Sequence, residues 1–426
     1  MMSPDRRRFL QLGASAAALS SLNALAGVNR KSIGHVVVVG SGYGGATIAK
    51  YLRLWSEGAV RVTVIERDAD FVSCPLSNLV ISGDRAMADI TLSYSGLQKT
   101  WGVSVIKAEA VSIDPDKRFV RLGTGDKIPY DRLVLSPGVD FMYDQIPGLD
   151  NAATQARIVH AWKAGPQTVT LRKQLEAMED GGIFAMTIPK APYRCPPGPY
   201  ERASLVAHYF KTRKPKSRVL ILDANEDVQS KKALFLQAWG DLYKDHLEYR
   251  NNSELNDVDA SNKTALLEFE RVKADVLNVI PPQRAGTIAS RLGLKLVNGR
   301  WVDVDWLTME STSHPGIHVL GDAVFPAPTM PKSGHMANQH AKLAAAAIIN
   351  LLKGEAPNPS PLVMNTCYSF VAPQQAIHVA SVHRYDEASH TLQPIKGAGG
   401  LSAARSEAEA KTALGWAQNI WADMLT

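Results

Sequence analysis

The sequence predicts an α/β protein with two βαβ frames of parallel strands and a smaller α+β part at its C-terminal end. Twice, a short apolar run passes directly into a turn rich in glycine or proline and then into a helix, which is typical of a buried parallel strand in such a frame. With 426 residues, 45% of them hydrophobic and 21% charged, the chain is long enough for two or three packed domains. This composition excludes a disordered, collagen-like or coiled-coil protein.

Charge and cysteine content exclude several functional classes. The formal net charge of +6 falls to +4 when residues 1–26 are set aside, and no stripe of Lys and Arg with interleaved aromatics follows, so nucleic acid is not an expected partner. Three cysteines are too few for a disulfide scaffold and too dispersed for a zinc site. No apolar run beyond the N-terminus reaches about 18 residues, so no membrane span is expected.

The N-terminus is typical of an export signal. Basic residues Arg6, Arg7 and Arg8 precede an apolar, small-residue run over 12–25 that ends in an A-x-A sequence. Paired arginines followed by Phe-Leu resemble the twin-arginine signal, a route for proteins that fold before crossing the membrane. We expect residues 1–26 to be a twin-arginine signal peptide and the mature protein to be periplasmic; an N-terminal anchor helix is the alternative.

The first βαβ frame carries a dinucleotide fingerprint. A β-branched strand over 36–39 runs into G-S-G-Y-G-G, a helix follows over 46–55, and a second strand over 60–65 ends at an acid 21 residues past the last fingerprint glycine. The glycines let the backbone approach a pyrophosphate at a helix N-terminus, and the acid accepts from a ribose hydroxyl. The cofactor-binding candidates of this frame are Gly40, Gly42, Gly45, Glu66 and Arg67.

Two later strands favour FAD over NAD. Residues 130–138 form an apolar strand closed by a Pro-Gly turn at Gly138, and residues 316–323 form another that ends at Gly321 and Asp322. Both resemble the secondary flavin motifs of the glutathione-reductase-like family of two-dinucleotide-fold flavoproteins. The resemblance implies that Asp322 holds the ribityl chain of FAD, and that the fold is a two-dinucleotide-binding-domain flavoprotein.

A helix N-terminus follows the Gly-Asp motif. Pro331 and Ser333 precede an Ala-rich helix that runs to about residue 352, a pattern typical of a helix start. In the resembling fold this positive helix end points at the flavin, and Lys332 is a further cofactor-binding candidate. His335 and His340 are five residues apart and share no helix face well, so we expect packing or surface roles and no metal.

The second frame lacks a nucleotide loop. Its strand over 181–188 leads into a proline-rich turn over 189–201 with no G-x-G-x-x-G, and a helix and a strand ending at Asp223 follow. Prolines deny the backbone donors that a pyrophosphate needs, so we expect no nicotinamide cofactor. Polar residues 251–263 are expected to form a surface loop.

The three cysteines carry the most specific pattern. An exported protein with an odd number of cysteines usually uses one for a special task, and by themselves the residues favour one structural disulfide and one buried thiol. The segments around Cys74, Cys195 and Cys367, together with the V-I-P-P-Q-R-A-G run over 279–286, resemble the flavoprotein subunit of flavocytochrome c sulfide dehydrogenase over nearly the whole mature chain.

This resemblance implies a function. In that family the cysteine at the position of Cys74 carries FAD covalently, and those at Cys195 and Cys367 form a redox disulfide that oxidises sulfide. Glu201 is a candidate general base, or else a helix N-terminal acid stabilised by the dipole. No C-x-x-C-H sequence occurs, so haem c is expected only on a separate cytochrome c subunit, in a heterodimer.

We expect three parts besides the signal: an FAD domain from 33–147 and 278–352, a second nucleotide-fold domain over 148–277, and a flavin-covering or interface domain over 353–426. The last ends in a helix over 402–424 whose Trp416, Ile420 and Trp421 suit a core or a cover over the flavin. The alternatives are a sulfide:quinone oxidoreductase, although the C-terminus shows no apolar membrane face, and a non-catalytic electron-transfer subunit.

Overall fold

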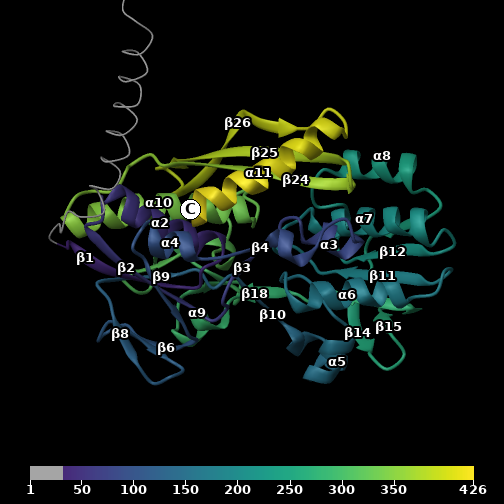
Figure 1. Ribbon diagram of the computed structural model, residues 1–426, viewed down its shortest axis with the longest axis horizontal. Coiled ribbons are helices and arrows are strands. Elements are labelled where there is room, and N and C mark those ends of the chain that lie inside the picture. The colour runs from purple at the N-terminus through teal and green to yellow at the C-terminus, as the bar shows by residue number, and fades with distance from the viewer. Residues whose placement is uncertain (1–31) are drawn as a thin grey trace, which may run out of the picture.

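A computed structural model describes residues 32–426. The expected signal peptide lies outside the described residues. Two α/β halves lie side by side, and the C-terminal strands and last helix extend across both of them (Figure 1). The confirmed fold class is therefore α/β, with an α+β part at the C-terminus.

The first half is built on a seven-stranded sheet in the order β21-β22-β23-β9-β1-β2-β5. The strands are β1 (Gly34–Val39), β2 (Val60–Glu66), β5 (Ser104–Lys107), β9 (Arg132–Leu135), β21 (Val304–Asp305), β22 (Glu310–Ser311) and β23 (Ile317–Val319). Strands β5, β2, β1, β9 and β23 run parallel, and Val39 lies opposite both Ile65 and Leu135. The β-branched runs are buried because the parallel part of the sheet lies inside the domain.

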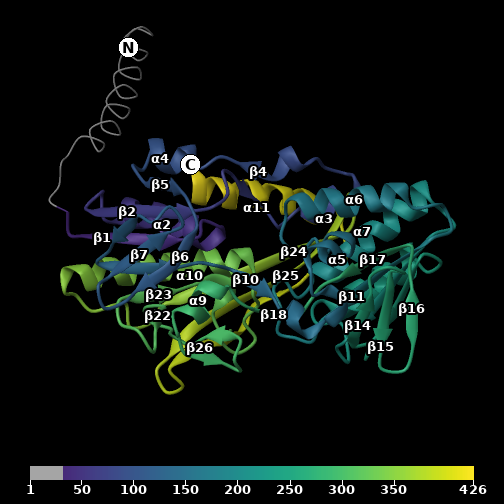
Figure 2. The same ribbon diagram turned by 90° about the horizontal axis from the view of Figure 1, so that it is seen from below.

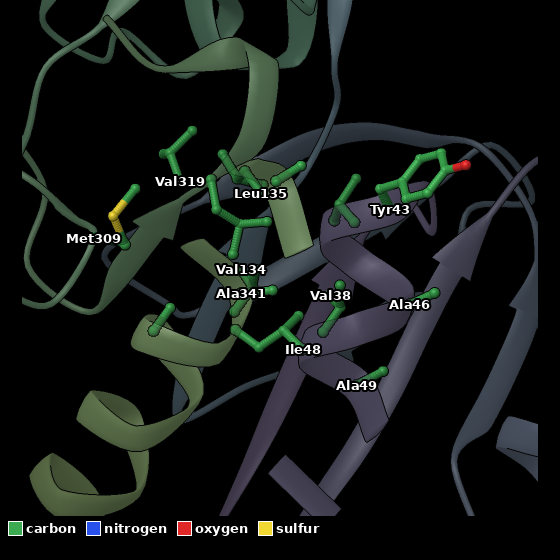
Figure 3. Close-up of a cluster of buried hydrophobic side chains, with 14 of the residues drawn as sticks. Val38, Tyr43, Ala46, Ile48, Ala49, Val134, Leu135, Met309, Val319 and Ala341 are labelled. Carbon is green, nitrogen blue, oxygen red and sulfur yellow. The ribbon is translucent and has the colours of Figure 1, made fainter. Parts of the chain in front are cut away.

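Two long helices pack on this sheet and on each other, namely α2 (Tyr43–Trp55) and α10 (Gly334–Lys353). Ile48 of α2 and Ala341 of α10 are fully buried in the same cluster as Val38 and Val134 of the sheet (Figure 3). The helix predicted after the Gly-Asp motif is confirmed, and the Ser333 side chain caps it by accepting from Met336 N at 3.0 Å.

The second half is a four-stranded parallel sheet in the order β13-β12-β11-β17. Its elements are β11 (Ile183–Ile188), β12 (Arg218–Asp223), β13 (Leu247–Arg250) and β17 (Val276–Val279), with helices α6 (Pro166–Ala177), α7 (Gly198–Arg213) and α8 (Lys232–Leu242). Strand β17 crosses the expected boundary at 277/278. The surface loop expected over 251–263 is wrong, because Leu255–Asp259 is strand β14, paired antiparallel with β15 (Thr264–Leu267).

The C-terminal part is an antiparallel sheet of β24 (Leu362–Ala372), β25 (Gln375–Asp386) and β26 (Thr391–Leu401), followed by α11 (Glu407–Leu425). Its long strands run diagonally from the first half to the second (Figure 2). Helix α11 begins at Glu407, later than expected, because the Ser406 side chain caps it by accepting from Glu409 N. The sheet thus carries Cys367 to the junction of the two halves.

The remaining elements are short. They are β3 (Phe71–Val72), α3 (Ser77–Ser82), β4 (Thr91–Leu92), α4 (Ser95–Lys99), β6 (Ala110–Asp114), β7 (Phe119–Leu122), β8 (Lys127–Pro129), β10 (Val139–Phe141), α5 (Ala152–Arg157), β16 (Arg271–Lys273), β18 (Gln283–Ala285), α9 (Thr287–Arg291), β19 (Leu296–Val297) and β20 (Trp301–Val302).

Arg202 of α7 ties these parts together from inside the protein. Its side chain is 1% exposed and donates to the carbonyls of His160 and Ala161 and to the amide oxygens of Asn78 and Asn278, at 2.6–3.1 Å. The guanidinium also lies over the Trp162 ring, 5.0 Å from its centroid. One buried cation therefore satisfies four acceptors from α3, β17 and the segment before α6.

Arg202→Met should lower the free energy of unfolding by about 3 kcal/mol, because four buried oxygens lose a hydrogen bond from the guanidinium and, within the described part of the chain, only the His160 carbonyl keeps another donor, Asn278 Nδ2. Arg213→Met, an exposed change on the same helix, is the matched control and should have little effect. Urea unfolding followed by tryptophan fluorescence measures both. Equal midpoints for the two variants would show that the buried network does not stabilise the fold.

Candidate active site

A cavity of about 540 Å³ lies where the carboxyl ends of β1, β2 and β9 meet the C-terminal sheet. Its wall comes from both halves and from β24, so segments more than 300 residues apart in the sequence share it. Gly40, Glu66, Cys74, Cys195 and Cys367 all line it. The residues that the sequence singled out in separate motifs therefore meet in one place.

The glycine turn after β1 forms one end of this cavity. Gly40 has a φ of +87°, and a Cβ there would stand 2.5 Å from the carbonyl oxygen of Ser136. At Gly42, by contrast, a Cβ would meet no heavy atom within 4 Å, and the N-terminus of α2 has no side-chain cap. The turn thus presents free backbone N–H groups to open space, as a phosphate requires.

Gly45 has a different role from the first two glycines. Its Cβ would stand 1.8 Å from the Gly40 carbonyl oxygen, and it does not line the cavity. We infer that it packs α2 against the turn. Glu66 accepts from the Ser41 N–H at 2.7 Å and lines the cavity. Arg67 beside it also lines the cavity, but its side chain is mostly exposed and pairs with Asp68 at 3.8 Å.

Two buried polar groups on the cavity wall have no hydrogen-bond partner among residues 32–426. They are Oδ1 of Asp322 and Nε of Arg194. Burial raises the pKa of the Asp322 carboxyl, so an orphaned oxygen there calls for a donor from a ligand. Gly138, with a φ of +66°, also leaves open space where a Cβ would stand. These residues fit FAD, whose ribityl hydroxyls and pyrophosphate supply such partners.

Lys332 lies behind this wall and not in the cavity. Its Nζ donates to the carbonyls of Asp322 and Val324 and sits 3.7 Å from the centroid of the Trp301 ring. Its backbone carbonyl accepts from Cys195 N at 2.8 Å. Lys332 therefore holds the Gly-Asp turn and the Cys195 loop together, and does not itself face the space for a cofactor.

The three cysteines are unbonded and partly exposed to the cavity. Cys74 lies within hydrogen-bonding reach of the Arg194 guanidinium. The Cys195 backbone is left-handed, with a φ of +57°, and burial, followed by the charge of Cys367, raises the pKa of its thiol. Cys367 Sγ accepts from Asn365 Nδ2 at 3.3 Å. The structure therefore places Cys195 and Cys367 close enough for the charge of one to affect the other, and Cys74 lines the same cavity.

Glu201 lies in the first turn of α7 and faces this cavity. Its Oε1 accepts from Phe370 N and its Oε2 from Asn78 Nδ2, both at 2.8 Å. Burial raises the pKa of the carboxyl, which suits a proton acceptor near neutral pH. The same two hydrogen bonds also join α7 to β24 and α3, so Glu201 has a structural role beside any chemical one.

The C-terminal part closes one side of the cavity. Trp416 of α11 lines it and packs against the rings of His335 and Tyr368, at 5.8 and 6.2 Å between centroids. Ile420 and Trp421 are buried in the core, and Trp421 Nε1 donates to Tyr43 OH at 3.1 Å. Of the three residues that we expected to pack in the core or cover the flavin, Trp416 therefore lies at the cavity, and Ile420 and Trp421 lie in the core.

The histidines of α10 pack as expected. His335 Nδ1 accepts from Thr366 N at 2.9 Å, and His340 is 2% exposed with Nδ1 against Gly321 N. Within residues 32–426, no three His, Cys, Asp or Glu side chains gather as metal ligands would.

Sequence reasoning missed Arg194 and Lys231. Arg194 directly precedes Cys195, so its position in the motif was visible, but its orientation toward Cys74 depends on the fold of the proline turn. Lys231 Nζ donates to the Cys367 carbonyl at 2.9 Å, although the two residues are 136 positions apart in the sequence. No local pattern signals such a contact.

The second βαβ frame is closed to a nucleotide by its own side chains. Asp223, at the end of β12, accepts from Tyr200 OH at 2.7 Å and Tyr249 OH at 3.2 Å on one oxygen. The other oxygen accepts from the backbone and side-chain nitrogens of Asn225. Both oxygens of the acid that would bind a ribose in such a frame therefore already accept hydrogen bonds from this chain.

Fold and cavity together define a two-dinucleotide-fold flavoprotein with a cysteine pair at its site. Family models match three segments: "Pyridine nucleotide-disulphide oxidoreductase" over 34–170, "Sulfide dehydrogenase [flavocytochrome c] flavoprotein chain, central" over 168–281, and "Flavocytochrome c sulphide dehydrogenase, flavin-binding" over 359–425. The chain is 53% identical over 45 residues to the sulfide dehydrogenase flavoprotein chain of Chlorobaculum thiosulfatiphilum, covering 11% of this chain and 92% of that sequence. The chain belongs to the family of flavocytochrome c sulfide dehydrogenase flavoproteins.

Related proteins agree with this assignment. The mitochondrial sulfide:quinone oxidoreductase of Mus musculus is 24% identical over 326 residues, which cover 74% of this chain and 71% of that protein. The solved sulfide:quinone oxidoreductase of Aquifex aeolicus matches with a TM-score of 0.74 at 18% identity, over 92% of this chain and 91% of that one, and so shares the fold. The protein is a FAD-dependent, sulfide-oxidising oxidoreductase.

NADH and NADPH should reduce the flavin at less than about 1% of the rate with sulfide. The reason is that prolines in the turn of the second frame remove backbone N–H donors for a pyrophosphate, and both oxygens of Asp223 already accept hydrogen bonds. Anaerobic mixing, followed by the loss of flavin absorbance, measures this directly. Sulfide in the same apparatus is the positive control. Rapid bleaching by either nucleotide would overturn our interpretation of residues 181–223.

Proposed function

We propose that this chain is the catalytic subunit of a periplasmic sulfide dehydrogenase, which oxidises sulfide to polysulfide or elemental sulfur at a Cys195–Cys367 redox disulfide. The observation that carries the proposal is that both cysteines line the cavity that fits FAD. They are unbonded in the structure, so their pairing is part of the proposal. A non-catalytic electron-transfer subunit would need no such pair.

The sulfur chemistry follows from nucleophilic attack on the bridge. Hydrosulfide attacks one sulfur, the S–S bond breaks, a persulfide forms on that cysteine, and the electron pair leaves with the other sulfur as a thiolate. A second hydrosulfide removes the outer persulfide sulfur as polysulfide and frees the first thiolate. When bound, FAD supplies the acceptor for the two electrons released as the bridge re-forms.

Several side chains prepare the site for these steps. Glu201, buried within the field of Cys195, can accept the proton that an incoming sulfide or persulfide loses. Arg194 holds positive charge beside Cys74, and the Cys195 N–H donates to the Lys332 carbonyl, which fixes the loop that carries one sulfur of the bridge. Trp416 and Tyr368 restrict the entry of water.

We infer that electrons leave to a haem c on a separate cytochrome c subunit, as the family name implies, because this sequence has no C-x-x-C-H haem site. The twin-arginine signal expected at residues 1–26 is the basis of the proposed periplasmic location. Over the described residues, none of the helices combines the length and apolarity needed to cross a bilayer. Purifying the complex and asking whether sulfide reduces a co-purifying haem tests this partner against a quinone.

FAD should be bound covalently through Cys74, which lies on the cavity wall beside the Arg194 guanidinium. After acid precipitation the yellow colour should stay with the protein, and a peptide containing Cys74 should carry the mass of FAD. Cys74→Ser should keep FAD bound but extractable, since the glycine turn remains. Recovery of all flavin in the supernatant of the unmutated protein would contradict the covalent bond.

Cys195→Ser and Cys367→Ser should each slow sulfide-dependent flavin reduction by more than about 1,000-fold while FAD stays bound, and the double variant should be no slower than either. The reason is that one bridge needs both sulfurs. A merely structural bridge would instead lower the melting temperature and leave activity at low temperature. A folded Cys367→Ser protein with near-normal sulfide oxidation would end the proposed mechanism.

A further inference from the structure

Lys231 is a buried ammonium directly behind Cys367. The residue is 5% exposed, and its Nζ donates to the Cys367 carbonyl at 2.9 Å and to Ser369 Oγ at 2.8 Å. It stands just before α8, in the second half of the molecule, and reaches strand β24 of the C-terminal part. Its backbone has a φ of +57°, a conformation that costs a residue with a side chain.

No carboxylate within residues 32–426 forms an ion pair with Lys231, although its neighbour Lys232 pairs with Asp227. Two neutral oxygens do not compensate a buried positive charge fully. The negative groups in its field are, in order of strength, Cys367, Glu201, Cys195 and Glu409. The strongest anionic partner available to this cation is therefore a sulfur.

We propose that Lys231 is a positioning residue that stabilises the anionic sulfur on Cys367 once the Cys195–Cys367 bridge is opened. This inference rests on the proposed function. Opening the bridge with hydrosulfide breaks the S–S bond and leaves a persulfide on one cysteine and a thiolate on the other, with one proton released. The displaced sulfur leaves as a thiolate, and a persulfide is a stronger acid than a thiol. Cys367 therefore carries negative charge as the bridge opens, whichever sulfur is attacked.

The charge of Lys231 has a defined pH range. Burial lowers its pKa from 10.5 to about 8, and the charges of Cys367 and Glu201 oppose that shift. The ammonium is thus present at neutral pH and is lost as the pH rises through about 8. Its effect on Cys367 should fade in the same range.

Other titratable groups face this region from the surrounding elements. Arg194 and Cys195 lie on the proline turn, Glu201 on α7, and His335 on α10, where it contacts Thr366 N. The pair of His378 and Glu409, 3.0 Å apart, joins β25 to α11. All of these side chains are the same in every Lys231 variant. The charge of Lys231 also lowers the pKa of Glu201, so Lys231→Arg, which keeps that charge, is the comparison that isolates the effect of the charge.

The test uses the purified flavoprotein carrying Cys195→Ser, so that Cys367 is a free thiol whether or not the unmutated protein forms the bridge. Methyl methanethiosulfonate, a small thiolate-specific reagent, is applied from pH 6 to pH 10, and mass spectrometry measures the labelling of the Cys367 peptide. Lys231→Met and Lys231→Gln remove the charge, and Lys231→Arg keeps it. Lys232→Met, which removes an exposed charge one residue away, is the matched control.

Lys231→Met should slow labelling about tenfold at pH 7, the size expected when an opposite charge is lost beside a thiolate, and the deficit should shrink above pH 8. Lys231→Gln, which still offers a donor to both oxygens, should behave alike and serves if the apolar variant does not accumulate as folded flavoprotein. Lys231→Arg and Lys232→Met should match the parent. Only a charge effect predicts this dependence on pH.

Equal labelling of the parent, Lys231→Met and Lys231→Gln at pH 7 would overturn the inference. A deficit that is the same at every pH would also overturn it, since that result means altered access. Peptide mapping of the otherwise unmutated protein separately shows whether Cys195 and Cys367 are bridged. If no bridge exists there, the proposed function fails by its own measurement.

Discussion

Parallel strand pairing is the constraint on which the whole site depends. Strands β1, β9 and β23 end at the same edge of the sheet, so the turns after Val39, Leu135 and Val319 must meet there. That meeting is close enough that Gly40 accepts no side chain against Ser136 O. The space left at this edge, and not any single motif, is what accommodates a long cofactor.

The second half of the molecule uses the same frame for another purpose. Prolines replace the nucleotide loop after β11, and Tyr200 donates a hydrogen bond to the acid at the end of β12, so this frame has no nucleotide site to maintain. The proline turn instead extends away from its own sheet. It reaches the first half, where Cys195 N binds the carbonyl of Lys332. A loop that binds nucleotide in related frames here delivers a sulfur to the flavin cavity.

The parts that sequence predicted well are those governed by local chemistry. The glycine turn, the strand before Asp322 and the cap at Ser333 each depend on a few adjacent residues, and the structure has them where the pattern indicates. Lys332 and Gly45 also lie in the right motifs, but both lie outside the cavity. Packing directs the Lys332 side chain behind the wall, and it places Gly45 against the Gly40 carbonyl. Strand β14 was missed because three of its five residues are polar and it pairs only with β15. Lys231 could not be found, since its contact joins segments 136 residues apart.

The charged residues around the cavity explain why the site needs side chains from distant parts of the sequence. Arg194 and Lys231 are buried cations without a carboxylate in ion-pair contact among the described residues, whereas burial raises the pKa of Asp322 and Glu201. A cavity built in this way is poised to receive anions at two points, the cofactor on one side and sulfur on the other. Since hydrosulfide, persulfide and thiolate are all anions, the same excess of positive charge favours each sulfur species in turn. Cys367, which the C-terminal strand β24 carries, therefore lies in a positive field that the second half of the molecule supplies through Lys231.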